Sequence, residues 1–186
     1  HMFGTRMWGV KADLWCLAKG ISSGYLPLGA TAIGSRVAEG FLKGDAGLGS
    51  IGHGYTYSGH PVAAAAGLAT LDILEREDVV GNAARQGEHL MARLRDIASR
   101  SRLVGDVRGV GLMVCLELVA DQGRKTPLPR GAKEVAAVAR SAYRRGAMVR
   151  TSGSNIIMSP ALTISREEID ALCDALDGAF AEVEGR

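Results

Sequence analysis

One lysine of the chain stands where an amine could bond covalently to a carbonyl compound. Lys19 follows an apolar run at residues 14–18 and precedes a turn rich in glycine and serine at residues 20–24. A lysine amine attacks a carbonyl only when deprotonated, so its pKa of about 10.4 must fall through burial or nearby positive charge. We expect burial at the strand end to supply this shift. The alternative is a solvated surface lysine, because most lysines are exposed.

A second polar segment could bind a phosphate group. Residues 52–61 place the hydroxyls of Thr56, Tyr57 and Ser58 among glycines, directly before the helix that Pro61 is expected to open. Free backbone N–H groups and the positive end of a helix dipole both favour a phosphate at such a position. A hydroxyl-rich helix cap is the alternative interpretation. The lysine and this segment together predict a site for a covalently held, phosphorylated cofactor.

The elements that must position these residues resemble a piece of a larger α/β sheet. The sequence predicts strands at residues 13–18 and 30–33, a helix at 36–42, a loop at 44–54 and an Ala-rich helix at 61–75. Proline suits the first turn of the last of these helices, and Ser58 or Gly59 could cap it. The two candidate segments therefore lie at the end of a strand and at the start of a helix.

The second half of the chain predicts a compact α+β unit. Its expected elements are a helix at 79–101, a strand-like run at 107–119, a helix at 131–145, strands at 147–150 and 155–158, and a last helix to about residue 182. Gly109 and Gly111 interrupt the strand-like run. Ser165 and Glu168 have the spacing of a capping box, which predicts the start of the last helix.

Composition restricts the class of protein. The 186 residues are 47% hydrophobic and 23% charged, as in globular proteins that form a sizeable core. The net charge of +2 gives no electrostatic reason to expect nucleic acid as a partner. No apolar run approaches the ~20 residues that cross a bilayer, so we expect no membrane partner. Three widely spaced cysteines without zinc-like spacing indicate no metal site and favour a cytoplasmic protein with reduced thiols.

Several segments closely resemble the class III (omega) aminotransferases, which are pyridoxal-phosphate enzymes of fold type I. The most specific are residues 13–30 (DLWCLAKGISSGYLPLGA) and 53–62 (HGYTYSGHPV). The similarity continues through residues 106–112 (DVRGVGL) and 149–153 (VRTSG) to the last helix, so it covers essentially the whole chain.

The resemblance implies a fold and a domain organisation. The expected fold class is α/β, with part of the large domain of a fold type I PLP-transferase followed by a small α+β domain. Residues 1–74 would be the C-terminal portion of the large PLP-binding domain. Residues 75–186 would form a linking helix and the small C-terminal domain.

The resemblance also implies a role for individual residues. Lys19 matches the lysine that holds pyridoxal phosphate as a Schiff base and later shuttles a proton. Thr56 matches the threonine that reaches across a homodimer to the phosphate of the partner's cofactor, with Tyr55 beside it. Arg150 matches a mobile arginine that pairs with the carboxylate of the keto acid or amino acid, a task that suits a planar guanidinium. A surface arginine at a turn is the alternative for Arg150. Arg108 is interpreted as structural.

The function implied by the resemblance is amino-group transfer from an amine or amino acid to a keto acid, with pyruvate as the expected acceptor. Family members also have a phosphate-binding glycine-serine loop, an aromatic residue that stacks on the cofactor and an aspartate that pairs with its ring nitrogen. None of these precedes Lys19 here. The chain is therefore expected to be the C-terminal part of an aminotransferase, inactive by itself because the ring loses most of its electron-sink character without that aspartate.

A second hypothesis is not catalytic. The chain could be a fragment, or one half of a split enzyme that needs an N-terminal partner chain. Residues 1–74 would then lack most of their sheet and leave strand edges and apolar surface uncovered. Under this hypothesis the isolated chain is marginally folded or self-associated.

Overall fold

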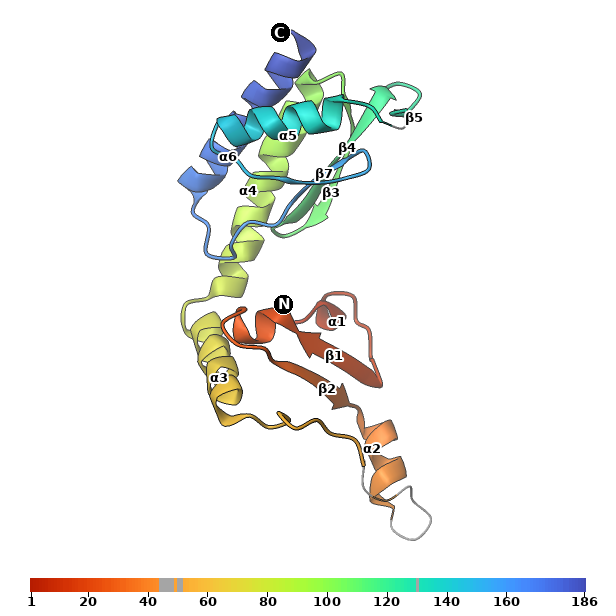
Figure 1. Cartoon of the computed structure of the whole chain (residues 1–186), viewed down its shortest axis with the longest axis vertical. Helices are drawn as coiled ribbons and strands as arrows, with labels where there is room; N and C mark the ends of the chain where they lie inside the picture. Colours follow the sequence, from red (N-terminus) through yellow and green to blue (C-terminus); the bar gives the residue numbers. More distant parts are fainter. Residues whose placement is uncertain (44–48, 50–51, 130) are drawn as a thin grey trace. The chain divides into compact units, whose positions relative to one another are not determined.

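The computed structural model describes residues 1–43, 49, 52–129 and 131–186, and these residues divide into two compact units (Figure 1). The units are His1–Val80 and Gly81–Arg186. The domain boundary expected at residues 74 and 75 falls inside a helix that ends at Arg76. Most of the loop expected at residues 44–54 lies outside the described residues.

The first unit is a two-stranded antiparallel sheet with short helices around it. Strand β1 (Leu14–Ala18) pairs with β2 (Gly29–Ile33), with Leu14 opposite Ile33 and Ala18 opposite Gly29. The helical elements are α1 (Gly4–Met7), the 3-10 helix η1 (Lys19–Ser22), α2 (Ser35–Leu42) and α3 (Pro61–Arg76). Both strands and the two longer helices confirm the sequence prediction, whereas α1 and η1 were not predicted.

The cap of α3 differs from the prediction. The N-cap residue is His60, whose Nδ1 accepts a hydrogen bond of 3.4 Å from the N–H of Ala63. The sequence favoured Ser58 or Gly59. Ser58 is unavailable because its hydroxyl accepts a hydrogen bond of 2.9 Å from the N–H of Tyr55. Gly59 adopts a left-handed backbone, with φ of 69°, and completes the turn before the helix.

The second unit is an antiparallel sheet with helices packed on it. The strand order is β3-β4-β7-β6, and the short strand β5 pairs with β4. The strands are β3 (Val104–Val110), β4 (Met113–Asp121), β5 (Thr126–Pro127), β6 (Arg150–Ser152) and β7 (Asn155–Met158). The helices are α4 (Val79–Arg100), α5 (Glu134–Arg144) and α6 (Arg166–Glu184). The capping box predicted at Ser165 and Glu168 is confirmed.

The strand-like run expected at residues 107–119 is a β-hairpin. Val110 lies opposite Met113, and Gly111 occupies the turn with φ of 55°. Gly109 and Gly111 interrupt this run, and a glycine inside a strand-like pattern marks either a bulge or a turn, so residue pattern alone does not show the reversal. The following hairpin is also shifted, because the first of its strands is β6 (Arg150–Ser152) and not residues 147–150.

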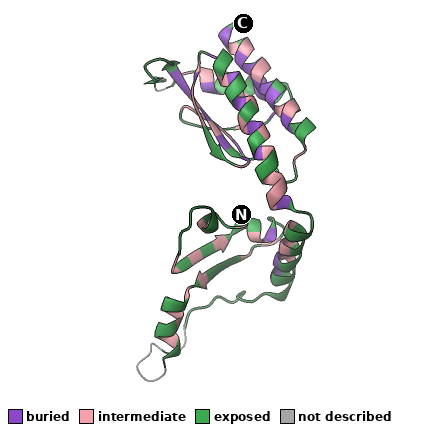
Figure 2. Cartoon of the chain, turned by 180° about the vertical axis from the view of Figure 1, so that it is seen from behind, coloured by how far each residue is buried: buried purple, intermediate pink, exposed green. Residues whose placement is uncertain are grey.

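The hydrophobic core lies in the second unit. One cluster joins alternate residues of β4 and β7 to the inner faces of α4, α5 and α6, and Figure 2 shows buried positions concentrated in this unit. The largest fully buried side chains are Phe180, Leu90, Leu94, Ile97, Leu116, Leu118, Ile156, Ile169, Leu176, Val104, Val114 and Val138. In the part of the chain that the structure describes, no helix is both long and apolar enough to cross a membrane.

Candidate active site

Lys19 lies where β1 ends and η1 begins. Its backbone is left-handed, with φ of 55°, a conformation that costs a non-glycine residue roughly 1–3 kcal/mol and is concentrated at functional sites. The side chain is exposed, so the burial expected from the sequence is not found. The reason is that β1 has β2 as its only partner strand among the described residues, and β1 alternates between exposed and half-buried positions.

The turn that follows Lys19 is closed by its own hydrogen bonds. Ser22 is 1% exposed, and its hydroxyl donates a hydrogen bond of 2.7 Å to the carbonyl oxygen of Leu26. The N–H of Ser23 donates to the carbonyl oxygen of Gly20 at 3.2 Å. Gly24 then turns the chain with φ of 76°. The lysine therefore precedes a fixed turn and not a loose loop.

Helix α3 packs against this turn. A β-carbon at Gly67 would lie 2.8 Å from Cδ2 of Leu28 and 3.5 Å from the carbonyl oxygen of Ile21. Glycine at this position lets the helix approach the turn closely. The segment that carries Thr56 leads directly into this helix, so the lysine turn and the hydroxyl-rich segment belong to one packed unit.

Thr56 stands in a tight turn with its hydroxyl free. The N–H of Tyr55 donates to the hydroxyl of Ser58, and the N–H of Ser58 donates to the carbonyl oxygen of Tyr55, both at 2.9 Å. The ring of Tyr55 lies edge-on to His53, with centroids 5.1 Å apart. Tyr55 and Thr56 are both exposed, and within the described residues the hydroxyl of Thr56 has no hydrogen-bond partner.

Asp13 is the carboxylate nearest to Lys19 in sequence, and it is already engaged. Arg36 donates from Nε to Oδ1 of Asp13 at 3.0 Å and forms a second bond through Nη2. These bonds hold the pKa of the Asp13 carboxyl below its usual value. Asp13 therefore joins the start of α2 to β1 and is not a free acid beside the lysine.

Arg150 lies in the second unit, at the start of β6. Its backbone pairs with Ile157 of β7, and its side chain is exposed. Among the described residues its guanidinium has no ion-pair partner. The predicted site residues are thus divided, with Lys19, Tyr55 and Thr56 in the first unit and Arg150 in the second.

Arg108 has the opposite environment. Its Nη1 lies 2.9 Å from Asp106 and 2.6 Å from Glu117, and its Nη2 donates to Asn155 at 3.0 Å. The hydrogen bond to Asp106 is the main cause of a raised pKa for Arg108, with Glu117 second. These contacts support the structural role expected for Arg108. Residue type and position offer no reason to select Asn155 from the sequence, because an asparagine after a Gly-Ser turn is a common turn residue.

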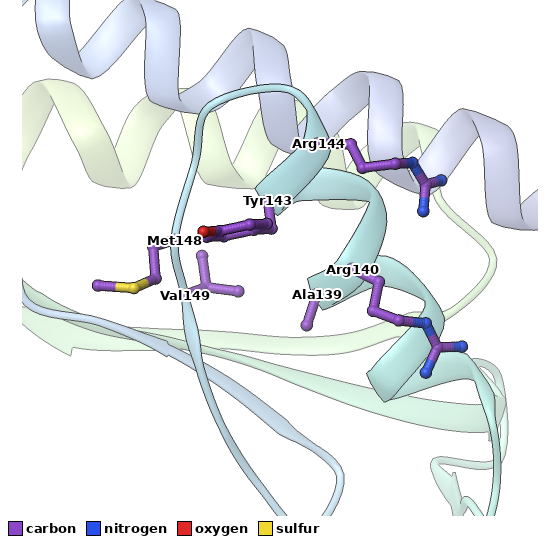
Figure 3. Close-up of a pocket in the computed structure, with 6 residues that line it drawn as sticks. All are labelled: Ala139, Arg140, Tyr143, Arg144, Met148 and Val149. Atoms are coloured by element: carbon purple, nitrogen blue, oxygen red, sulfur yellow. The ribbon is translucent and has the colours of Figure 1, made fainter.

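A surface hollow of about 380 Å³ lies elsewhere in the second unit. It is lined by Ala139, Arg140, Tyr143, Arg144, Met148 and Val149 (Figure 3). Both guanidinium groups point away from Tyr143, and Arg144 is bound to Glu182 at 2.6 Å. None of the predicted site residues lines this hollow, and its arginine charges are not directed into it.

Comparison with known proteins identifies the family. The family described as aminotransferase class III matches residues 1–180, so the chain belongs to the class III aminotransferases. An uncharacterized aminotransferase of Sinorhizobium fredii is 39% identical over 98% of this chain and 39% of its own length. A diaminobutyrate–2-oxoglutarate transaminase of Halomonas elongata is 37% identical over 97% of this chain and 39% of its own length.

Solved structures give the fold. An amine transaminase from an uncultivated Pseudomonas species, in the PLP-bound internal aldimine form, is 47% identical with a TM-score of 0.91, covering 98% of this chain and 41% of that chain. An (S)-enantioselective omega-transaminase from Thermomicrobium roseum is 40% identical with a TM-score of 0.88 over 98% of this chain and 40% of that chain. The fold is therefore part of a fold type I PLP-transferase. The chain spans about two fifths of the length of these proteins.

The residues of the first unit fit the cofactor of this family, pyridoxal phosphate. An exposed amine at the end of a strand suits the aldehyde of the cofactor, and the free hydroxyl of Thr56 suits a phosphate oxygen. The closed turn after Lys19 keeps the backbone near the amine compact. A carboxylate for the ring nitrogen is not supplied by Asp13, which is bound to Arg36.

Proposed function

We propose that the protein to which this chain belongs transfers an amino group from an amine or amino acid to a keto acid, with pyridoxal phosphate held on Lys19. The observation that carries the proposal is Lys19 itself, which stands in a left-handed backbone at the end of β1, directly before a closed turn. It does so in a chain that belongs to the class III aminotransferases.

The proposal gives each site residue one task. Lys19 would hold the cofactor through Nζ, and its amine would move a proton at the substrate carbon. The bound cofactor supplies an electron-withdrawing ring that stabilises negative charge on that carbon. Thr56, with Tyr55 beside it, would donate a hydrogen bond from its hydroxyl to the cofactor phosphate of the partner in a homodimer. Arg150 binds the substrate carboxylate through its planar guanidinium.

The proposed acceptor is pyruvate and the proposed donor an amine. The support is the segment at residues 56–61 (TYSGHP), which resembles the amine–pyruvate branch, together with the 47% identity to an amine transaminase. The name of the Halomonas elongata relative, which is 37% identical, includes 2-oxoglutarate. Activity with pyruvate should therefore be measured against activity with 2-oxoglutarate. A cytoplasmic location is part of the same proposal.

A borohydride experiment tests the lysine. The protein would be incubated with pyridoxal phosphate, the adduct reduced with borohydride and the modified peptide identified by mass spectrometry. Wild-type protein should carry the adduct on Lys19, and Lys19→Ala should lose it. Lys11→Ala is the matched control, because Lys11 is an exposed lysine that precedes β1, whereas Lys19 follows it. An adduct that persists in Lys19→Ala, or that disappears in Lys11→Ala, would show that the assigned lysine is wrong.

A non-catalytic fragment or split half is the second candidate. It is favoured by a core that lies in the second unit. The same labelling experiment separates the two. An adduct that forms on Lys19 only when a chain carrying the N-terminal part of a class III aminotransferase is added supports the split half, whereas an adduct on the chain alone contradicts it.

A further inference from the structure

Arg150 shares one face of the second sheet with a polar network. In antiparallel strands, directly opposed residues point to the same face. Arg150 and Ser152 lie opposite Ile157 and Asn155. The register continues across the sheet, with Asn155 opposite Glu117 and Ile157 opposite Cys115. The next strand adds Arg108 opposite Cys115 and Asp106 opposite Glu117.

The other face of the same strands is buried in the core. Val114, Leu116, Ile156 and Met158 alternate with the residues of the polar face, and each is at most 4% exposed. The core helices contribute to the same cluster as these side chains. Arg150 therefore lies on the face of the sheet opposite to this core, directly beside Ile157 and on the same face as the polar network.

Asn155 connects the hairpin of β6 and β7 to this network. Its Oδ1 accepts hydrogen bonds from Nη2 of Arg108 at 3.0 Å and from the thiol of Cys115 at 3.3 Å. Its Nδ2 donates to the carbonyl oxygen of Ser152 at 3.0 Å. One amide group thus joins the last residue of β6 to both β3 and β4.

Strand β6 needs this connection because it is short and has one neighbour. It comprises three residues, Arg150–Ser152, at the end of the strand order. A backbone bond of 2.9 Å from the N–H of Leu118 to the carbonyl oxygen of Ser154 holds the turn itself. Without the amide of Asn155, β6 would keep its pairing with β7 but lose the side-chain link from Ser152 to the rest of the sheet.

Of the two arginines considered on this face, Arg150 is the one whose guanidinium can pair with a charged ligand. Arg108 is neutralised by Asp106 and Glu117, whereas Arg150 has no ion-pair partner among the described residues. A carboxylate that approaches this face would therefore pair with Arg150 and not with Arg108.

We propose that Asn155 is a positioning residue for keto-acid binding, because it fixes the hairpin that presents Arg150. This inference rests on the proposed function, in which Arg150 binds the substrate carboxylate. Asn155 itself touches no substrate in this scheme. Its effect should appear only where a carboxylate is bound.

Steady-state kinetics of the complete enzyme with pyridoxal phosphate test the proposal. Asn155→Ala should raise the KM for pyruvate about tenfold, as for the loss of roughly 1.4 kcal/mol of binding free energy. Its kcat should stay within about twofold, and the half-reaction with 1-phenylethylamine, which has no carboxylate, should be unchanged. Gln122→Ala is the matched control, because the amide of Gln122 also donates to a backbone carbonyl, that of Val104 at 2.8 Å, away from the hairpin. It should leave both reactions unchanged.

Hydrogen exchange supplies a readout that is independent of catalysis. Amides of peptides covering residues 150–158 should exchange faster in Asn155→Ala, whereas Gln122→Ala should leave these amides as in the wild type. Equal exchange in Asn155→Ala and the wild type would overturn the proposal. So would an equal loss of activity with pyruvate and with 1-phenylethylamine, which indicates general damage to the fold.

Arg150→Ala, measured in parallel, separates the two proposals. If it raises the KM for pyruvate and Asn155→Ala does not, the role of Asn155 is wrong and the function proposed for Arg150 stands. If neither variant changes that KM, the carboxylate-binding role of Arg150 is also wrong. A rise in both variants, with 1-phenylethylamine unaffected, supports both.

Discussion

Some residues of the first unit are exposed although their neighbours in sequence are apolar. Cys16 and Lys19 stand in or directly after an apolar run, yet both are exposed. The shared cause is that β1 pairs with one strand among the described residues and alternates between exposed and half-buried positions. Cys173 has the opposite environment, because α6 directs it into the core, where it is fully buried.

Thiol labelling should distinguish these two cysteines. Burial raises the pKa of the Cys173 thiol to about 11, so below that pH the thiol is mostly protonated and reacts slowly. At pH 8, iodoacetamide should modify Cys16 in the native chain and Cys173 only after unfolding, as measured by peptide mass spectrometry. Rapid native labelling of Cys173 would contradict the packing of α6.

Pairs of elements in the second unit depend on glycines at close contacts. Gly87 weakens the intrinsic helix propensity of α4, but a β-carbon there would lie 2.5 Å from Cα of Gly111. The glycine therefore lets α4 approach the turn between β3 and β4. Gly178 of α6 is different, because a β-carbon there would meet the flexible guanidinium of Arg145, at 3.1 Å.

Alanine substitutions should separate these two glycines. Gly87→Ala should lower the free energy of unfolding by about 1–3 kcal/mol, because backbone atoms of Gly111 cannot easily move away. Gly178→Ala is the control. It should change that free energy by less than about 1 kcal/mol, since the side chain of Arg145 can shift and alanine favours the helix. Urea denaturation followed by circular dichroism measures both, and equal effects would contradict the close contact.

The second unit of the molecule has a hydrophobic core, and the first unit has no core of comparable size among its described residues. The core cluster is built from residues of Gly81–Arg186. The first unit exposes large apolar side chains, among them Trp8, Leu14 and Leu68. Burial of apolar surface is the main favourable term in folding, so the two units should differ in local stability.

Limited proteolysis should reveal this difference. Brief digestion of the chain with trypsin should remove the first unit and leave a fragment that starts near the boundary after Val80 and extends to the C-terminus. Mass spectrometry identifies the fragment, and size-exclusion chromatography before and after digestion reports self-association through the first unit. Equal resistance of both units, in a monomeric chain, would contradict the expected difference in local stability.

Periodicity and motifs were sufficient for most elements and for the family. The capping box, the longer helices and the strand that ends directly before Lys19 follow from local sequence, because hydrogen bonding and side-chain periodicity within a few residues decide them. The segment around Lys19, paired with the one around Thr56, predicted class III aminotransferases, which the family comparison confirms. The roles of Lys19, Tyr55, Thr56 and Arg150 stay predictions.

Tertiary structure alone decided the features that depend on residues distant in sequence. The hairpin at Gly111 and the close approach of Gly87 required knowledge of which segments meet. The exposure of Lys19 depends on which residues pack on β1, and local sequence does not predict those residues. Asn155 became a candidate only when the strand register brought it to Arg108, Cys115 and Ser152. Sequence by itself thus determined which chemical groups are present, whereas their surroundings arise from non-local contacts that no short segment encodes.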